Sequence, residues 1–139
     1  MTLVQKAISA IAFIALAACA GMTQTGKTMN ISLSGSEEVP PVATAGSGSG
    51  SIMIADDGSV SGSVTTTGVP GTMAHIHLGA KGQNGGVIIP LAKNGDTYSV
   101  PTGAKLTDAQ MAAFKAGNLY VNVHTATNKG GEVRGQLQP

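Results

Sequence analysis

The sequence LYVNVHTATNKGGEVRGQL, residues 119–137, gives the clearest indication of the fold. Two sets of side chains alternate along residues 119–125, and a period of two residues is typical of a β-strand. Residues 128–131 combine Asn and Gly in a turn, and residues 132–137 resume a strand pattern. The stretch therefore predicts two consecutive strands joined by a turn.

Short strand patterns continue upstream of this pair. We predict strands at residues 30–35, 51–55, 59–66, 73–79, 87–91 and 97–100. Asp57 and Gly58 predict one hairpin turn, since Asp-Gly accepts the positive φ angles of a tight turn. Asn94 and Gly95 predict a second, which joins residues 87–91 to residues 97–100. The segment AGSGSGS, residues 45–51, is interpreted as a flexible lead into a strand.

One helix interrupts the strand patterns. Thr107 is a favourable N-cap residue, and Gln110 completes a capping box with it. Gly117 suits a left-handed C-terminal stop, so the helix is predicted at about 108–116. About eight strands with one short helix predict an all-β fold, either an antiparallel β-sandwich or a Greek-key barrel.

The N-terminus has the pattern of an exported lipoprotein. Lys6 precedes an apolar run that is too short to span a membrane, and LAAC, ending at Cys19, matches the bacterial lipobox. We expect a signal peptide at 1–18, a lipidated Cys19 with a flexible tether to residue 28, and one domain at 29–139. In the lipoproteins that this segment resembles, the lack of an aspartate at position 20 favours the outer membrane, facing the periplasm. An ordinary signal peptide with an incidental cysteine is the alternative.

The composition excludes several classes of protein. The formal net charge is +1 and 11% of the residues are charged, so the chain offers no basic stripe for nucleic acid. It holds no Trp, two Tyr and two Phe, which leaves few rings for stacking bases or sugars. Cys19 is the single cysteine, so the domain has neither a disulfide nor a thiolate metal site. No complete catalytic motif such as G-x-S-x-G is present, which argues against an enzyme.

The three histidines are the main chemical lead. His75 and His77 are two residues apart in MAHIHLG, so on a strand both project from one face. His124 projects from the face of the LYVNVHT strand that also carries Tyr120 and Asn122. If the two strands are neighbours or face each other across a sandwich, the imidazoles converge in a site that suits copper or zinc. The alternative is a set of polar residues that hydrogen-bond to one another and to loops.

Further residues extend this candidate site. Met73 shares the face of the paired histidines, and its soft thioether would favour Cu(I). Met73 and Glu132 are candidate fourth ligands, and Asn122 and Glu132 are candidates to orient a ligating imidazole. Tyr120 and Arg134 are expected around the ligands.

Charged residues near these strands suggest structural contacts. Glu132 and Arg134 lie two residues apart, and such a pair is predicted to form an ion pair or to bind a neighbouring carboxylate. Glu37 and Glu38 precede two prolines at a rigid bend. They are candidates to bind Arg134 or to cap the metal site.

Four segments resemble the CHRD domain, a family named for repeats in the animal protein chordin. They are SGSEEVPPV, AHIHLGAKGQNGGVIIPL, LTDAQMAAFKAGNLYVNVHT and GGEVRGQL, and the resemblance covers about residues 30–138. It implies a β-rich extracytoplasmic module, which in chordin accompanies domains that bind growth factors, and it brings no settled activity for bacterial members. The candidate residues within the family's segments are His75, His77, Tyr120, Asn122, His124, Glu132 and Arg134.

Three functions compete at this point. The leading hypothesis is a lipoprotein that binds one copper or zinc ion through His75, His77 and His124, without catalysis or with weak redox activity. The second is a binding or structural module of the envelope that contacts another protein. The third is a copper enzyme of the dismutase kind, because the H-x-H strand resembles that of copper-zinc superoxide dismutases. Those enzymes use more histidines and an internal disulfide, which this chain lacks.

Overall fold

The structure, a computed structural model, describes residues 24–139. The predicted signal peptide, Cys19 and the first residues of the predicted tether lie outside the described residues. The strands within 24–139 are β1 (Gly26–Ser34), β2 (Ser47–Ala55), β3 (Val60–Thr67), β4 (Gly71–Leu78), β5 (Val87–Pro90), β6 (Ala92–Asn94), β7 (Thr97–Ser99), β8 (Leu119–Thr125) and β9 (Val133–Leu137). A 3-10 helix, η1, spans Gly35–Glu37, and an α-helix, α1, spans Asp108–Lys115. Neither helix of this described part could cross a membrane.

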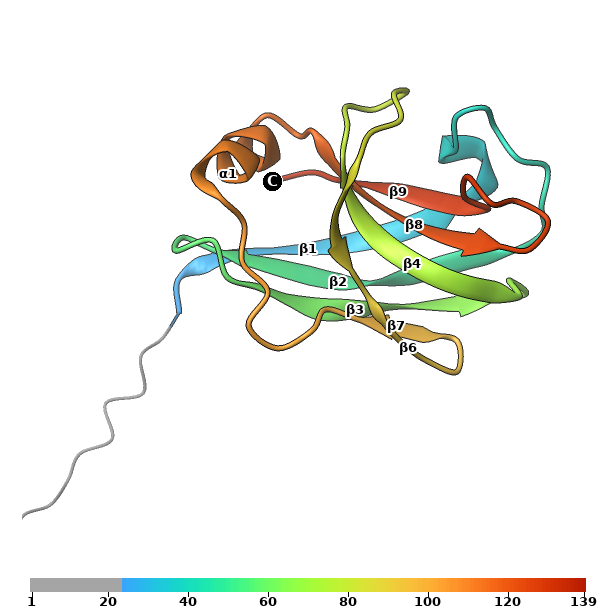
Figure 1. The fold of residues 1–139 in the computed structure, drawn as a ribbon, viewed down its shortest axis with the longest axis horizontal. Coiled ribbons are helices and arrows are strands. Elements are labelled where there is room, and N and C mark those ends of the chain that lie inside the picture. Colours follow the sequence, from blue (N-terminus) through green and yellow to red (C-terminus); the bar gives the residue numbers. More distant parts are fainter. Residues whose placement is uncertain (1–23) are drawn as a thin grey trace, which may run out of the picture.

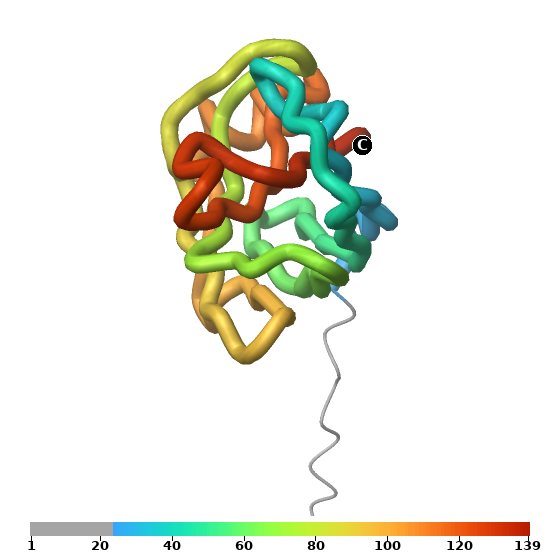
Figure 2. The backbone as a smooth tube through the Cα atoms, turned by 90° about the vertical axis from the view of Figure 1, so that its right-hand side faces the viewer, coloured from blue at the N-terminus to red at the C-terminus, as the bar shows by residue number. Residues whose placement is uncertain are grey.

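The nine strands form one antiparallel sheet in the order β5-β4-β8-β9-β1-β2-β3-β7-β6. The edge strands β5 and β6 are consecutive in the chain and are separated only by Leu91, which donates a backbone hydrogen bond to Ala74 of β4. Residues 87–94 therefore bring the two edges together. The sheet curls into a nearly closed barrel (Figure 1), and Figure 2 looks along its strands. The prediction of an all-β antiparallel fold with one short helix is confirmed.

The alternation of side chains along β4 and β8 separates the core from the candidate site. Five alternate residues of these strands point into the barrel and are at most 1% exposed: Ala74, Ile76, Leu119, Val121 and Val123. The residues between them project from the outer face, where the loops 79–86 and 126–132 lie over them. One face of these strands thus builds the core, and the other is free to carry polar chemistry.

The interpretation of residues 45–51 as a flexible lead is wrong. Residues 47–51 belong to β2, which pairs with β1 on one side and with β3 on the other. Small residues are required there, because a Cβ atom at Gly48 would lie 2.9 Å from Leu33 and one at Gly50 would lie 2.7 Å from the Cα atom of Val64. The long pairing with β2 also makes β1 begin at Gly26 rather than at residue 30.

One of the two predicted hairpins is correct. The turn at Asp57 and Gly58 joins β2 to β3, and Gly58 takes the positive φ of +88°. The second turn lies at residues 95–96 and joins β6 to β7, whereas β5 pairs with β4 instead of β7. The chain therefore changes its strand partner at Leu91, since β5 pairs with β4 and β6 pairs with β7. This change lets one continuous segment join the two edges of the sheet.

The predicted helix is confirmed as α1. The backbone N–H of Gln110 donates to the Thr107 hydroxyl at 3.2 Å, and the backbone N–H of Thr107 donates to the Gln110 side chain at 2.9 Å. Gly117 follows the helix with φ at +76°. Both ends are thus fixed by the residues that predicted them.

Candidate metal site

The register of β4 and β8 places the predicted site residues on one surface. Met73 is opposite His124, His75 is opposite Asn122, and His77 is opposite Tyr120. Directly opposed residues of an antiparallel pair share a face of the sheet. On the next strand, β9, Arg134 lies opposite Asn122 and continues this face.

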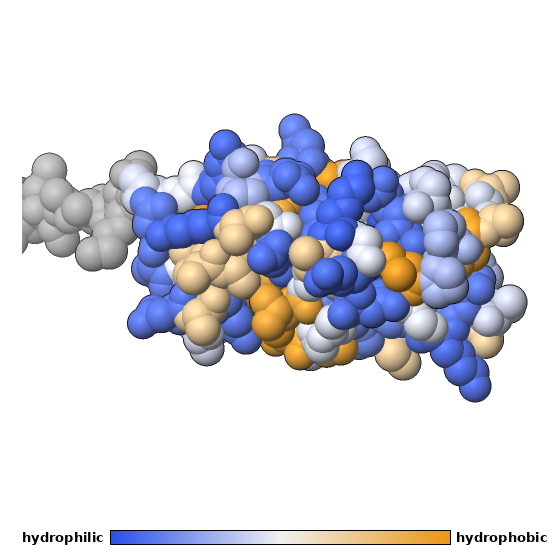
Figure 3. Space-filling view, turned by 90° about the horizontal axis from the view of Figure 1, so that it is seen from above, coloured by the Kyte–Doolittle hydropathy of each residue, from blue (hydrophilic) through white to orange (hydrophobic). Residues whose placement is uncertain are grey.

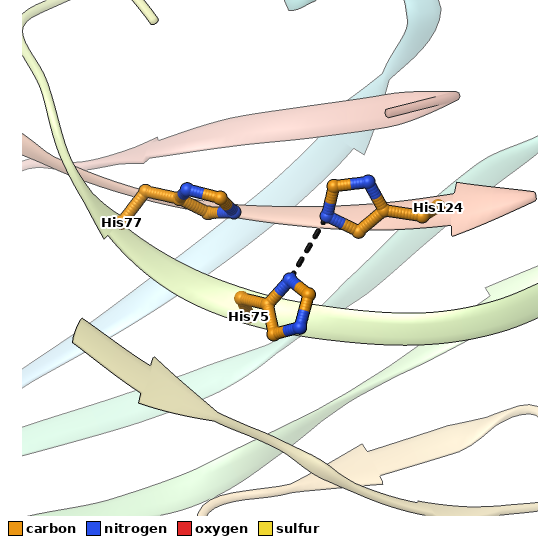
Figure 4. A group of neighbouring side chains, drawn as sticks. All are labelled: His75, His77 and His124. Atoms are coloured by element: carbon orange, nitrogen blue, oxygen red, sulfur yellow. Dashed lines mark hydrogen bonds between the residues drawn. The ribbon is translucent and has the colours of Figure 1, made fainter. Parts of the chain in front are cut away.

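The three imidazoles converge on this face (Figure 4). The Nδ1 atom of His75 lies 3.0 Å from the Nε2 atom of His124. One ring nitrogen from each of His75, His77 and His124 lies within 4.8 Å of the others, and this trio contains no carboxylate. Three nitrogen donors grouped in this way could hold one metal ion.

Backbone carbonyls fix the tautomers of two of these rings. The Nδ1 atom of His77 lies 3.0 Å from the carbonyl oxygen of Gly85, and the Nδ1 atom of His124 lies 2.8 Å from that of Lys129. A carbonyl oxygen only accepts, so each Nδ1 must carry the proton and donate it. In the neutral rings each Nε2 atom is therefore left with a bare lone pair, which is the form that binds a metal. The Nδ1–H of His75 then donates to the Nε2 atom of His124.

Two buried acceptor atoms on this face have no donor within residues 24–139. They are the Nε2 atom of His77 and the Oδ1 atom of Asn122. The Asn122 amide cannot be reversed without loss, because its Nδ2 atom donates to the carbonyl oxygen of Gly130 at 3.1 Å. Unpaired buried acceptors are rare in folded proteins, and a bound cation or water would supply what both atoms lack.

The site is mostly buried but opens beside His124. His77 is 6% exposed and His124 is 8% exposed, while His75 is partly buried. A hollow of about 360 Å³ lies against His124, and its lining includes Met73 and Lys129. Met73 is 51% exposed, so its thioether stands at the rim. An ion could therefore enter from this side.

Burial keeps two of the imidazoles neutral. It lowers the pKa of His75, and the charges of His124 and His77 lower it further. Burial also lowers the pKa of His77, although the hydrogen bond to Gly85 acts in the opposite direction. Neutral imidazole is the ligating form, so the environment prepares these rings for a metal.

A stack of three side chains supports the ring of His77. That ring lies parallel to the ring of Tyr120, with centroids 4.7 Å apart and an angle of 2° between the planes. The guanidinium carbon of Arg134 lies 3.5 Å from the centroid of the Tyr120 ring. The Tyr120 hydroxyl also accepts a hydrogen bond from the N–H of Gly85 at 3.1 Å. Tyr120 therefore steadies both His77 and the loop that holds its Nδ1 atom.

The predicted ion pair between Glu132 and Arg134 does not form. Glu132 accepts hydrogen bonds from Thr44 at 2.9 Å and from Asn128 at 3.3 Å. Hydrogen bonding, first from Thr125, lowers the pKa of Glu132 in spite of its burial. Both carboxylate oxygens thus have partners, and Glu132 stands apart from the three imidazoles. Within residues 24–139 the ion pair that forms joins Lys81 to Glu37 at 3.4 Å.

Arg134 instead binds neutral groups. It is 1% exposed and donates to the carbonyl oxygen of Ala80 at 3.0 Å and to the Gln136 side chain at 3.1 Å. A more distant bond reaches Asn84 at 3.4 Å. Arg134 therefore ties the loop 79–86 to the sheet and leaves its charge without a carboxylate contact in the described part of the chain.

Sequence reasoning missed the groups that orient the imidazoles. The carbonyl oxygens of Gly85 and Lys129 are backbone atoms, so no side-chain pattern marks them. The glycine pair in QNGGV was the available signal, because a Cβ atom at Gly85 would overlap the carbonyl of Leu78. A glycine in a loop next to H-x-H can mark a close backbone approach, which leaves no room for a Cβ atom.

Fold and site together define a small all-β barrel with a three-imidazole cluster on its outer face. The chain matches the family model of the CHRD domain over residues 29–137, and it therefore belongs to the CHRD domain family. The cluster lies inside the matched range. No curated protein and no solved structure matches the chain.

Proposed function

We propose that this CHRD-domain protein binds one copper or zinc ion through His75, His77 and His124. The observation that carries the proposal is the fixed tautomer of His77 and His124. Each Nδ1–H is committed to a backbone carbonyl, so each Nε2 lone pair faces the cluster without a proton. A polar network built only for stability would pair the buried Nε2 atom of His77, and that atom has no partner among the protein groups of residues 24–139.

The spacing of the donors suits a single ion. Zinc binds imidazole nitrogen at about 2.0–2.1 Å, so two nitrogens on one tetrahedral zinc ion lie about 3.3 Å apart. The Nδ1 atom of His75 and the Nε2 atom of His124 are 3.0 Å apart, close to that spacing, and His75 ligates through Nδ1 once its ring proton moves to Nε2. A nitrogen of His77 lies within 4.8 Å of both, so the three rings must draw together to surround one ion. Three imidazoles leave a fourth position for water, or for Met73 at the rim, and the thioether would favour Cu(I).

The proposal includes a place for the protein in the cell. A lipid on Cys19 would anchor the domain in the outer membrane facing the periplasm. The CHRD family supports an extracellular type of domain. Stable anchoring takes more than one acyl chain, which a diacylglyceryl group provides.

A module that binds another envelope protein is the second candidate. Met73, Leu78 and Val87 are large apolar residues that are 42% to 51% exposed. On the face shown in Figure 3, however, hydrophilic residues divide the hydrophobic surface into separate groups. Protein interfaces usually need a continuous apolar centre, so the imidazole cluster favours metal binding over this alternative.

Metal analysis with thermal melting tests the proposal. The nine-stranded sheet and the core are formed within residues 24–139, so a chain that begins at Ala20 carries the fold described above. Purified from a periplasm without a histidine tag, this chain is expected to hold close to one equivalent of copper or zinc. The His75→Ala, His77→Ala double variant is expected to lose the metal and still fold.

A matched control comes from the same strand. Leu78→Ala changes an exposed residue of β4 that projects from the other face, so it is expected to keep the metal. Absence of metal, together with a melting temperature that copper and zinc fail to raise, would reject metal binding and favour the protein-binding module. Superoxide turnover by the copper-loaded protein separates a dismutase from a carrier.

A further inference from the structure

The segment after η1 places a buried acid next to the histidine cluster. Glu38 is 4% exposed, and its Oε1 atom has no hydrogen-bond partner in the part of the chain that the structure describes. A Cβ atom at Gly131 would overlap both the Glu38 carboxyl and the Asn122 amide, so these two groups meet over the bare Gly131 backbone. The fold therefore keeps space at Gly131 for this contact.

Asn122 connects this acid to a proposed metal ligand. It lies between Arg134 on β9 and His75 on β4, and its amide meets the Glu38 carboxyl over Gly131. The amide is also close enough to Glu38 and His77 to affect the pKa of both. The buried atoms without partners on this outer face are Glu38 Oε1, Asn122 Oδ1 and His77 Nε2. All three are acceptors when the carboxyl is ionised, so a cation among the imidazoles would satisfy a face that has too few donors.

The positive charges on this face also need a negative charge to balance them. Arg134 is buried, and no carboxylate lies within ion-pair distance of it in residues 24–139. Its guanidinium lies on Tyr120, which in turn lies against His77. An ion at the imidazoles adds positive charge to this already positive face. The buried acid attracted to Arg134 is Glu38.

We infer that Glu38 is a positioning and charge-balancing residue that makes the three-histidine site favour a divalent ion over a monovalent one. It acts through Asn122 and does not touch the ion. The inference rests on the proposed metal binding and specifies which ion charge the site prefers. Coulomb energy is proportional to the charge of the ion, so a nearby carboxylate favours Zn²⁺ twice as strongly as Cu⁺ in free energy.

The protonation of Glu38 agrees with this role. Burial raises the pKa of its carboxyl to about 7, although Arg134 and then Asn122 act to lower it. The other acids nearby are occupied, since Glu37 pairs with Lys81 and Glu132 is held by Thr44 and Asn128. Near neutral pH the carboxyl is thus partly neutral without the ion and ionises when a cation arrives.

The test compares Zn²⁺ and Cu⁺ association constants by competition with chelators, using the chain that begins at Ala20. Glu38→Gln keeps the shape and removes the charge. We expect it to weaken Zn²⁺ binding about tenfold and Cu⁺ binding about threefold, since halving the ion charge halves the free-energy change. Glu38→Asp keeps the charge and is expected to retain the wild-type ratio of the two constants.

Glu37→Gln is the matched control. It removes the same charge from the adjacent residue, whose side chain is 35% exposed and paired with Lys81. We expect its two constants to stay within about twofold of wild type, because exposed charges are screened.

Proton release gives a reading that a merely structural role would not change. At pH 6.5 a carboxyl with a pKa of about 7 is roughly three quarters protonated. Calorimetry in buffers of different ionisation enthalpy is therefore expected to show wild type releasing up to that fraction of a proton more than Glu38→Gln on binding Zn²⁺.

Equal losses of Zn²⁺ and Cu⁺ affinity in a folded Glu38→Gln protein, or none, would overturn the inference while leaving metal binding intact. Loss of the wild-type ratio in a folded Glu38→Asp protein would also overturn it. A wild-type protein that binds neither ion refutes the proposed function itself, and the inference with it.

Discussion

The acceptors that hold His77 and His124 are backbone carbonyl oxygens, which a change of side chain does not remove directly. For His77 that carbonyl belongs to Gly85, whose position depends on a close approach to the backbone carbonyl of Leu78. If the carbonyl moves, the Nδ1 atom loses its acceptor and the ring can adopt the other tautomer. The metal affinity of the site thus depends on a glycine that carries no chemical group of its own.

Substitution of Gly85 tests this dependence. Gly85→Ala is expected to lower the affinity for Zn²⁺ by about tenfold to a hundredfold, because the new methyl group displaces the loop and its carbonyl. Gly86→Ala is the control, since a Cβ atom there would meet nothing within 4 Å. Competition with a chelator measures both constants. Equal affinities in the two variants would contradict the role of the Gly85 carbonyl.

The pH dependence of metal binding also belongs to individual residues. His75 and His77 have pKa values below their ordinary 6.5, so they stay neutral as the pH falls through 6.5. A proton competes with the metal only below those lowered values. We expect Zn²⁺ affinity to change little between pH 8 and 6.5 through these two rings and to fall steeply at lower pH. A titration of Glu38→Gln from pH 8 to 4 removes the contribution of that carboxyl and checks this. An affinity that falls as steeply between pH 8 and 6.5 as at lower pH would contradict the lowered pKa values of the two rings.

At the scale of elements, β2 shows how strand pairing can override composition. Gly50 is opposite Val64 of β3, and an added Cβ atom would lie 2.7 Å from the Val64 Cα atom. Gly50→Ala is expected to reduce the free energy of unfolding by about 1–3 kcal/mol, since the two strands must separate. Ser49→Ala, at an exposed position of β2, should change it by less than about 0.5 kcal/mol. Denaturant unfolding measures both, and equal stability of the two variants would show that β2 tolerates side chains at this position.

The elements differ in how far local sequence determines them. The helix α1 could be predicted because Thr107 and Gln110 cap it within four residues of chain. The strand β2 could not, because Gly and Ser also make linkers, and its identity comes from β1 and β3. The convergence of the histidines followed from alternation once β4 and β8 were neighbours. Glu38 reaches Asn122 from a distant part of the chain, and no local pattern reports that contact.

At the scale of the whole molecule, residues 87–94 close the barrel while the loop just before them carries Gly85. Closure and site construction are therefore linked through one continuous segment. The loop 79–86 lies over the outer face and is tied down by Arg134 and Tyr120. The surroundings of the cluster lower the pKa values of two imidazoles and raise the pKa of one carboxyl. Both shifts favour the neutral side chain, so the cluster can be buried without unfolding the domain.

The free energy of unfolding of the metal-free protein is expected to depend on pH through both kinds of pKa shift. His75 and His77 have lowered pKa values, so the stability that they contribute is present above pH 6.5 and is lost as the pH falls through the lowered values. Glu38 has a pKa raised from 4.5 to about 7, so its contribution is present below pH 4.5 and is lost as the pH rises through 7.

Glu38→Gln separates the two contributions. Its free energy of unfolding relative to wild type is expected to rise by about 2 kcal/mol from pH 5 to pH 8, because only the wild type must ionise a buried carboxyl over that range. Urea unfolding in the presence of a chelator measures the difference at each pH, and Glu37→Gln provides the baseline. A difference that stays constant with pH would mean that Glu38 titrates normally, and charge balance at the site would then have to come from solvent.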